Sequence, residues 1–192
     1  MSTTQPIRDL KELEILKNYY RTIRPNLRNY VLIHTGLNTA LRISDLLTLQ
    51  WKDVYDFSRN CFRNHISLIE QKTGKASSIA INHSLHQTLS EYLLSLPSVL
   101  PDEFLFPGRN ANMPLSRSQA FRLIKHACTQ TKLPEHISCH SLRKTFGYHA
   151  WAAGANPTIL MMIYNHSSFS ITKRYLGLEQ DDKDQIFLSI NL

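Results

Sequence analysis

The chain of 192 residues is 42% hydrophobic and 19% charged, a composition typical of a globular protein rather than a disordered or fibrous one. No apolar run approaches the ~20 residues that cross a bilayer, and the first nine residues are polar. We therefore expect a cytoplasmic protein without a membrane partner. The three cysteines lack paired spacing, which argues against a disulfide framework or a zinc site. The net charge of +7 favours a polyanionic partner, of which nucleic acid is the commonest.

Helical spacing of apolar residues dominates the first fifty positions. It predicts helices over residues 10–20, from Pro25 through residue 37, and over residues 43–49. The pattern then changes to alternation between residues 62 and 81, on either side of the sequence KTGK at positions 72–75. This alternation predicts a β-hairpin with a glycine-containing turn.

Helical signals return after Asn82 and continue toward the C-terminus. They predict helices beginning after Asn82 and after Ser116, one over residues 142–153 that ends at Gly154, and short ones over 157–163 and 171–176. The helix after Ser116 is expected to bury Ala120, Phe121, Ile124, Ala127 and Cys128. We therefore expect an α+β fold, mostly α-helical with one small antiparallel β-sheet, in which residues 1–192 form a single domain.

Four short segments carry the polar side chains that phosphate chemistry requires. They are GLNTALRISDLLTLQWKDV (36–54), EQKTGK (70–75), HSLRKTF (140–146) and NHSSFSITKRYLG (165–177). In this order the segments resemble the arginine box, the lysine hairpin, the H-x-x-R box and the terminal tyrosine box of the tyrosine recombinases, the phage integrase family. The resemblance covers about residues 30–180, and it implies the catalytic-domain fold of that family.

The resemblance assigns Tyr175 as the nucleophile that attacks a DNA phosphate. Such an attack places negative charge on the non-bridging oxygens, and two arginines can hold those oxygens with charged, bidentate hydrogen bonds. Arg42 and Arg143 are the candidates. The alternatives are a surface arginine at a helix start for Arg42 and, for Arg143, a solvated helix face shared with Lys144.

Histidine and lysine side chains complete the implied catalytic set. An imidazole can assist deprotonation of the tyrosine, and His140 is the candidate for that step. His166 would complete the phosphate cradle. Lys72 would protonate the departing 5′ oxygen, with Lys75 as the competing candidate in the same turn.

The chain also departs from the family pattern. Its arginine box begins near residue 36, so we expect a catalytic domain without the family's N-terminal core-binding domain. Asn165 stands where glycine is usual, and asparagine reaches the left-handed conformation more readily than most residues. Residues 56–63 read as an insertion before the hairpin. The tail, residues 179–192, is expected to dock on a neighbouring protomer or to pack on its own domain.

The resemblance implies a site-specific recombinase that cleaves and rejoins duplex DNA through a 3′-phosphotyrosine, without ATP, a divalent metal or another cofactor. It further implies a homo-tetramer on DNA, with accessory DNA-bending proteins or a partner recombinase. Two other functions would keep the same residue types. One is a non-catalytic DNA-binding regulator with the recombinase fold, and the other is an enzyme resembling the type IB topoisomerases.

Overall fold

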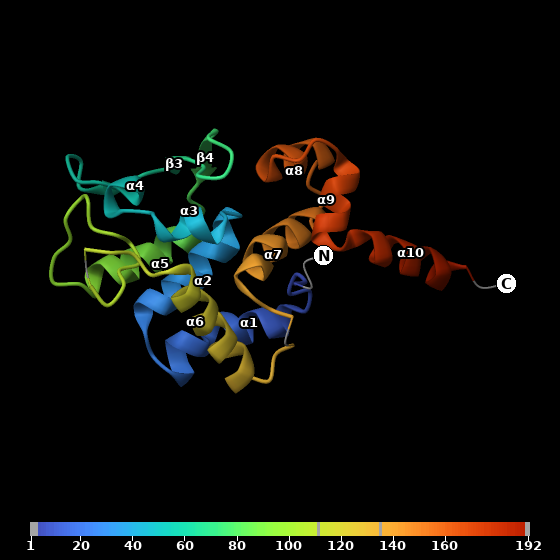
Figure 1. The fold of residues 1–192 in the computed structure, drawn as a ribbon, viewed down its shortest axis with the longest axis horizontal. Helices are drawn as coiled ribbons and strands as arrows, with labels where there is room; N and C mark the ends of the chain where they lie inside the picture. Colours follow the sequence, from blue (N-terminus) through green and yellow to red (C-terminus); the bar gives the residue numbers. More distant parts are fainter. Residues whose placement is uncertain (1–3, 111, 135, 191–192) are drawn as a thin grey trace.

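The computed structural model describes residues 4–110, 112–134 and 136–190, and helices dominate it (Figure 1). In chain order the elements are α1 (Leu10–Asn18), the π-helical turn η1 (Tyr19–Ile23), α2 (Leu27–Thr39), α3 (Ile43–Leu47), α4 (Trp51–Val54), β1 (Tyr55–Asp56), β2 (Cys61–Phe62), β3 (His65–Ile69), β4 (Ala76–Ala80), α5 (His83–Leu94), α6 (Arg117–Gln130), α7 (Cys139–Ala152), α8 (Pro157–Tyr164), α9 (Phe169–Leu176) and α10 (Leu178–Ser189). The expected mostly helical fold is confirmed.

The β-structure consists of two antiparallel pairs in the part of the chain that the structure describes. Strands β3 and β4 form the expected hairpin, with Ile66 opposite Ile79 and the KTGK turn between them. Strands β1 and β2 form a second, shorter hairpin, with Tyr55 opposite Phe62. The expectation of one sheet was therefore wrong. The inserted residues, which carry no clear alternation, fold back as a short ribbon of their own.

Side-chain caps fix where the helices begin. Asn26 accepts a hydrogen bond from the backbone N–H of Asn29, so α2 starts after Asn26 and two residues later than the position predicted for Pro25. Ser116 and Gln119 form a reciprocal capping box at the start of α6. Each helix thus begins directly after a residue whose side chain satisfies a backbone N–H group that has no partner within the helix.

Helix α2 lies at the centre of the main core and contacts α1, α3, α5 and α7 (Figure 1). It is buried on all sides, since Val31, Leu32 and Ile33 are fully enclosed on successive positions. The predicted buried stripe of α6 is confirmed for four of its five residues, but Phe121 is 46% exposed and was assigned wrongly. Helix α2 ends at Thr39, three residues before Arg42, so the end of this central helix fixes where the arginine-box segment lies.

A second, smaller core joins α7, α8 and α9. Its buried members are Ala40, Leu160, Tyr164, Leu176 and Leu178. Gly147 of α7 allows the close approach, because a Cβ there would meet the Tyr164 hydroxyl and would lie 2.7 Å from Leu176 Cδ2. The absence of a side chain at Gly147 therefore brings α9 directly against α7.

Helix α10 extends away from the rest of the fold (Figure 1). Its apolar residues Ile186, Phe187 and Leu188 are 59%, 79% and 85% exposed. The alternative that these residues pack on their own domain is therefore wrong for the described part of the tail. Across the described ranges no helix is both long and apolar enough to cross a membrane.

Candidate active site

The four sequence boxes meet where α3, the β3–β4 turn, α7 and the α8–α9 segment converge. Arg42 is the residue that precedes α3, and Lys72 and Lys75 belong to the β3–β4 turn. His140 and Arg143 lie on the first turns of α7. The connection between α8 and α9 adds His166, and α9 itself adds Tyr175, so the structure assembles these residues from distant segments.

Arg143 occupies the centre of this cluster and is 5% exposed. Its Nη1 donates to the carbonyl of Ala40 at the end of α2, and its guanidinium stacks 4.6 Å above the Tyr164 ring. The neighbouring Lys144 is also buried. The alternative of a solvated helix face shared by these two residues is therefore wrong. Arg143 is held with its charge directed into the site.

The Tyr175 ring lies among aromatic and cationic groups. The rings of His166 and Tyr164 each lie 5.3 Å from it, and Lys144 Nζ lies 5.1 Å from its centre. Burial raises the pKa of the Tyr175 phenol, while the charge of Arg143 and its hydrogen-bonding interaction with the phenol oppose that increase. The pKa of the Tyr175 phenol is raised overall, and the cations limit that increase.

Arg42 is held by a carboxylate that sequence reasoning did not assign to the site. Its Nη1 lies 2.5 Å from Glu70 Oε2, and the same oxygen accepts hydrogen bonds from Thr73 Oγ1 at 2.9 Å and Asn165 Nδ2 at 3.2 Å. The Glu70 side chain is only 4% exposed and that of Arg42 18%, so the surface alternative for Arg42 is also wrong. Glu70 joins the arginine box, the hairpin and the terminal box.

The alternation of the hairpin contained a signal for Glu70. Ile66, Leu68 and Glu70 share one face of β3 and its extension, and Ile66 is fully buried. An acid that continues a buried face needs a cationic or hydrogen-bonding partner. That partner, Arg42, lies 28 positions away in the sequence, so the pattern alone did not identify it.

Asp45 anchors the hairpin from the other side. It is buried, and its Oδ1 accepts a hydrogen bond of 3.0 Å from the backbone N–H of Gln71. Its Oδ2 has no hydrogen-bond partner within the described residues. The acidic residue three positions after Arg42 thus fixes the hairpin against α3, one residue away from the candidate Lys72.

The two histidines are biased toward the neutral form. Desolvation and the charges of Lys144 and Arg143 lower the pKa of His140. Burial and the charge of Arg143 lower the pKa of His166, whose Nδ1 lies 3.0 Å from Thr172 Oγ1. A neutral imidazole can accept a proton near neutral pH. No hydrogen bond joins His140 to Tyr175 in the described structure.

The two candidate lysines differ in their contacts. Lys75 Nζ donates to Asn165 Oδ1 at 3.3 Å, so this lysine ties the hairpin to the α8–α9 segment. Lys72 is exposed and makes no hydrogen bond or ion pair to any residue that the structure describes, while its charge contributes to the lowered pKa of His140. Asn165 itself is left-handed, with φ of 55°, as expected from its place at the end of α8.

The donors at this site suit an anion rather than a metal. Two arginines, three lysines and two histidines lie at the site, against two buried carboxylates: Glu70, which pairs with Arg42, and Asp45, which bonds to the hairpin. In the described part of the chain, no group of three or more His, Cys, Asp or Glu side chains is placed to hold a metal ion. A phosphate group would match this charge and hydrogen-bonding pattern.

Comparisons with known proteins agree with this geometry. The model of the phage integrase family matches residues 9–181. The protein of Bacillus subtilis (strain 168) described as "Probable integrase/recombinase YoeC" is 40% identical over 94% of this chain and 93% of its own length. The chain spans about half the length of other curated relatives, such as the tyrosine recombinase XerD of Rickettsia bellii, which is 28% identical over 77% of this chain and of which 51% is covered.

Solved structures show the same fold. The XerA recombinase superposes with a TM-score of 0.75 over 98% of this chain and 65% of that chain, at 19% identity. The Tn1549 transposon integrase, solved in complex with a circular intermediate DNA, superposes with a TM-score of 0.65 at 26% identity, over 88% of this chain and 60% of that one. Together with the family match over residues 9–181, these findings show that the chain belongs to the phage integrase family of tyrosine recombinases.

Proposed function

We propose that this chain is a site-specific recombinase that cleaves and rejoins duplex DNA through a covalent 3′-phosphotyrosine at Tyr175. The observation that carries the proposal is the placement of Tyr175 beside the buried Arg143, whose charge and hydrogen bond oppose the increase that burial causes in the pKa of the phenol. A tyrosine beside a buried arginine suits attack on a phosphodiester, because the same cation would stabilise the charge of the transition state.

In this mechanism Arg42 and Arg143 hold the non-bridging oxygens of the scissile phosphate, and His166 donates a further hydrogen bond to them. The Tyr175 oxygen attacks phosphorus and its proton passes toward neutral His140. The bond from phosphorus to the 5′ oxygen breaks, leaving a 3′-phosphotyrosine. Attack by a 5′ hydroxyl from a partner strand then reverses these steps. The phosphotyrosine retains the bond energy, so rejoining requires no ATP.

Lys72 protonates the departing 5′ oxygen in this proposal. Its ammonium group makes no hydrogen bond to a described residue, so the side chain is available to contact a phosphate bound beside the hairpin turn. Lys75, by contrast, already bonds to Asn165. The free lysine is therefore the better proton donor, and the bonded one is a structural tie.

Duplex DNA is the proposed substrate. The net charge of +7, the cluster of cations at the site and the DNA-bound Tn1549 integrase all support it. We further propose a homo-tetramer on DNA, with accessory DNA-bending proteins or a partner recombinase as further partners. The exposed Ile186, Phe187 and Leu188 on the projecting α10 supply an apolar surface for a neighbouring protomer.

A covalent-trapping assay tests the proposal. The protein and the Tyr175→Phe variant are incubated without metal with nicked duplexes drawn from DNA flanking the gene, and the products are separated on a denaturing gel. Tyr55→Phe, which removes a hydroxyl from the outlying β1–β2 hairpin, is the matched control. We expect an adduct from the wild type and from Tyr55→Phe, and none from Tyr175→Phe.

Other outcomes identify the alternative functions. Measurable DNA binding with no adduct on any library of native duplexes would favour the non-catalytic regulator. Relaxation of a supercoiled plasmid that lacks a target site would favour a topoisomerase-like enzyme. Deletion of residues 185–192 is expected to abolish multimers on DNA while leaving adduct formation on a single site intact, and multimers that survive the deletion would contradict the proposed role of the tail.

A further inference from the structure

An N-terminal strap, defined as residues 4–9, lies along the catalytic helix α7. Lys144 Nζ donates to the carbonyl of Thr4 at 2.6 Å, and the N–H of Ile7 donates to Thr145 Oγ1 at 2.8 Å. His149 Nε2 lies 3.0 Å from the carbonyl of Ile7, whose side chain is 1% exposed. The strap is therefore fixed to α7 over more than one helical turn, beginning at the residue next to Arg143.

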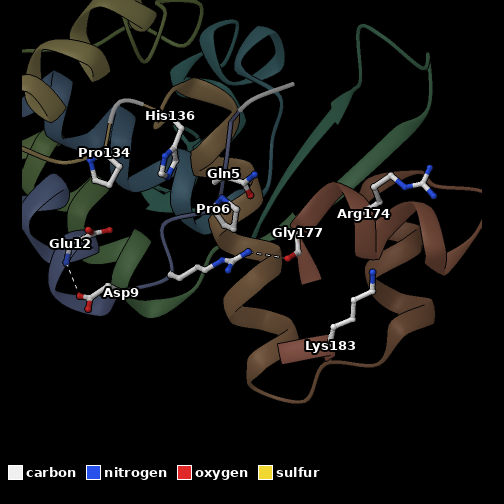
Figure 2. A pocket seen from close by; sticks show the side chains of 10 residues that line it. Gln5, Pro6, Asp9, Glu12, Pro134, His136, Arg174, Gly177 and Lys183 are labelled. Atoms are coloured by element: carbon white, nitrogen blue, oxygen red, sulfur yellow. Dashed lines mark hydrogen bonds between the residues drawn. The ribbon is translucent and has the colours of Figure 1, made fainter. Parts of the chain in front are cut away.

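The same strap reaches the helix that carries the nucleophile. Arg8 Nη2 donates a hydrogen bond of 2.9 Å to the carbonyl of Gly177, which follows the last residue of α9 (Figure 2). The Arg8 guanidinium also lies 5.4 Å from the ring centre of Tyr148 on α7. One side chain thus connects α7 to the junction between α9 and α10.

Gly177 is shaped for this contact. Its φ is 77°, in the left-handed region that glycine adopts readily, and it ends α9 two residues after Tyr175. A Cβ at this position would lie 3.0 Å from Gln5 Oε1 and 3.1 Å from Arg8 Nη2. The strap therefore packs closely against the end of α9, and the absence of a side chain at Gly177 makes this close contact possible.

The surroundings of Arg8 are open rather than part of the core. An open cavity of about 640 Å³ is lined by Arg8 together with Gln5, His136, Arg174 and Lys183 (Figure 2). Arg8 is exposed, in contrast to its buried neighbour Ile7. Replacing Arg8 would therefore remove the tie to Gly177 without leaving a void in either core.

We propose that Arg8 is a positioning residue for Tyr175. The inference rests on the proposed function, in which Tyr175 attacks the phosphate held by Arg143. Helix α9 is 8 residues long, so its orientation depends on its contacts with α7 and on its ends. By bonding to Gly177 from a strap that is itself fixed to α7, Arg8 holds the tyrosine at a set place relative to the phosphate cradle.

The test compares Arg8→Ala and Arg8→Lys with Arg59→Ala, which removes the same charge from the exposed β1–β2 turn. The single-turnover rate of adduct formation is measured on a nicked duplex at saturating protein. Misplacement of a reacting group by about 1 Å can lower a rate by roughly a hundredfold, so we expect Arg8→Ala to be slower by at least about tenfold. Arg8→Lys, which can still donate one hydrogen bond, should recover most of the rate, and Arg59→Ala should match the wild type.

Two further readouts separate positioning from other roles. A duplex with sulfur in place of the bridging 5′ oxygen needs no proton donor for its leaving group, so the Arg8→Ala defect should persist on it. Amide hydrogen exchange should rise in residues 169–177 of Arg8→Ala and stay unchanged in α2 and α5, because the hydrogen bond to Gly177 lies at the end of α9.

Several results would overturn the proposal. They are a wild-type rate for Arg8→Ala, recovery of that variant on the sulfur duplex, and increased exchange throughout the molecule. Failure of the wild type to form any adduct would instead refute the proposed function. In that case hydrogen exchange still tests the tie, since unchanged exchange in residues 169–177 of Arg8→Ala would show that Arg8 does not hold α9.

Discussion

Replacing Glu70 with glutamine tests whether one buried carboxylate organises the active site. The substitution keeps the size of the side chain and one carbonyl oxygen but removes the negative charge opposite Arg42. In the structure Glu70 Oε2 lies 2.5 Å from Arg42 Nη1, and the two side chains are 4% and 18% exposed. The Glu70 carboxylate is therefore shielded from water, whereas the Arg42 side chain keeps partial contact with water.

The expected magnitude follows from this geometry. Removing one partner of a fully buried ion pair costs about 3–5 kcal/mol of unfolding free energy. Glutamine retains neutral hydrogen bonds and Arg42 keeps some contact with water, so we expect a loss of about 2–3 kcal/mol for Glu70→Gln. For a domain of this size that loss lowers the Tm by roughly 5–10 °C. The exposed pair of Arg21 and Glu91, with 3.1 Å between its charged atoms, provides the control, and Glu91→Gln should cost less than about 1 kcal/mol.

The assay is denaturant unfolding of wild type and both variants at several pH values. Burial raises the pKa of Glu70, but the hydrogen bonds from Arg42 and Thr73 and the charge of Arg42 outweigh burial and leave it below the ordinary value of 4.5. The charge of Glu70 thus stabilises the fold above pH 4.5, and this stabilisation is lost as the pH falls through the lowered pKa. The gap between wild type and Glu70→Gln should therefore be full at pH 7 and should close in acid. Equal losses for Glu70→Gln and Glu91→Gln at pH 7, or a gap independent of pH, would refute the reasoning.

Three further predictions concern catalysis, pH and packing. Lys72→Ala should slow adduct formation on an ordinary duplex, and its rate should recover on a duplex with a bridging 5′ sulfur. Lys75→Ala should cleave both duplexes at the same rate. If the sulfur duplex restored the rate of Lys75→Ala alone, the assignment of the two lysines would be reversed. His34 is buried, and burial lowers its pKa to about 4, so it stays neutral in the folded state while it is protonated in the unfolded state. The free energy of unfolding should therefore decline by about 3 kcal/mol as the pH falls from 6.5 to 4. Denaturant unfolding of His34→Gln should lack that decline. Gly147→Ala should cost about 1–3 kcal/mol and also slow cleavage, because a Cβ there pushes α9 away from α7, and unchanged unfolding would contradict the close packing.

Most of the fold was predictable because its signals are local. Apolar spacing identified the helices, and alternation on either side of the KTGK turn identified the β3–β4 hairpin. One helix boundary and one hairpin were missed for physical reasons. Pro25 is compatible with a helix start, but the Asn26 side chain caps the helix and moves its first residue to Leu27. The short β1–β2 hairpin carries no alternation that a sequence pattern could reveal.

The candidate site was predictable only as a set of residue types. All six predicted side chains lie on the elements that converge at one end of the fold, but their roles stay a proposal. The burial of Arg143 and Lys144 was not predictable from their own helix, since two adjacent cations on α7 fit a solvated face equally well. Their burial depends on the packing of α9 and on the contact between Thr4 and Lys144, which are 140 positions apart.

The charge balance of the site explains why Arg42 and Arg143 have different kinds of partner. Arg143 is buried beside Tyr175, and the positive charge of Arg42 lowers the pKa of Arg143. The two cations therefore repel each other in a site that is shielded from water. Glu70 offsets Arg42, whereas Arg143 bonds to the neutral carbonyl of Ala40. Among the described residues, Glu70 is thus the one carboxylate that forms an ion pair with either arginine, and the two arginines together keep a net positive charge. In the proposed function a phosphate would supply negative charge at this point, so the repulsion between the two cations would be relieved when the substrate binds. The relief would be largest in the transition state, where the phosphate carries the most charge.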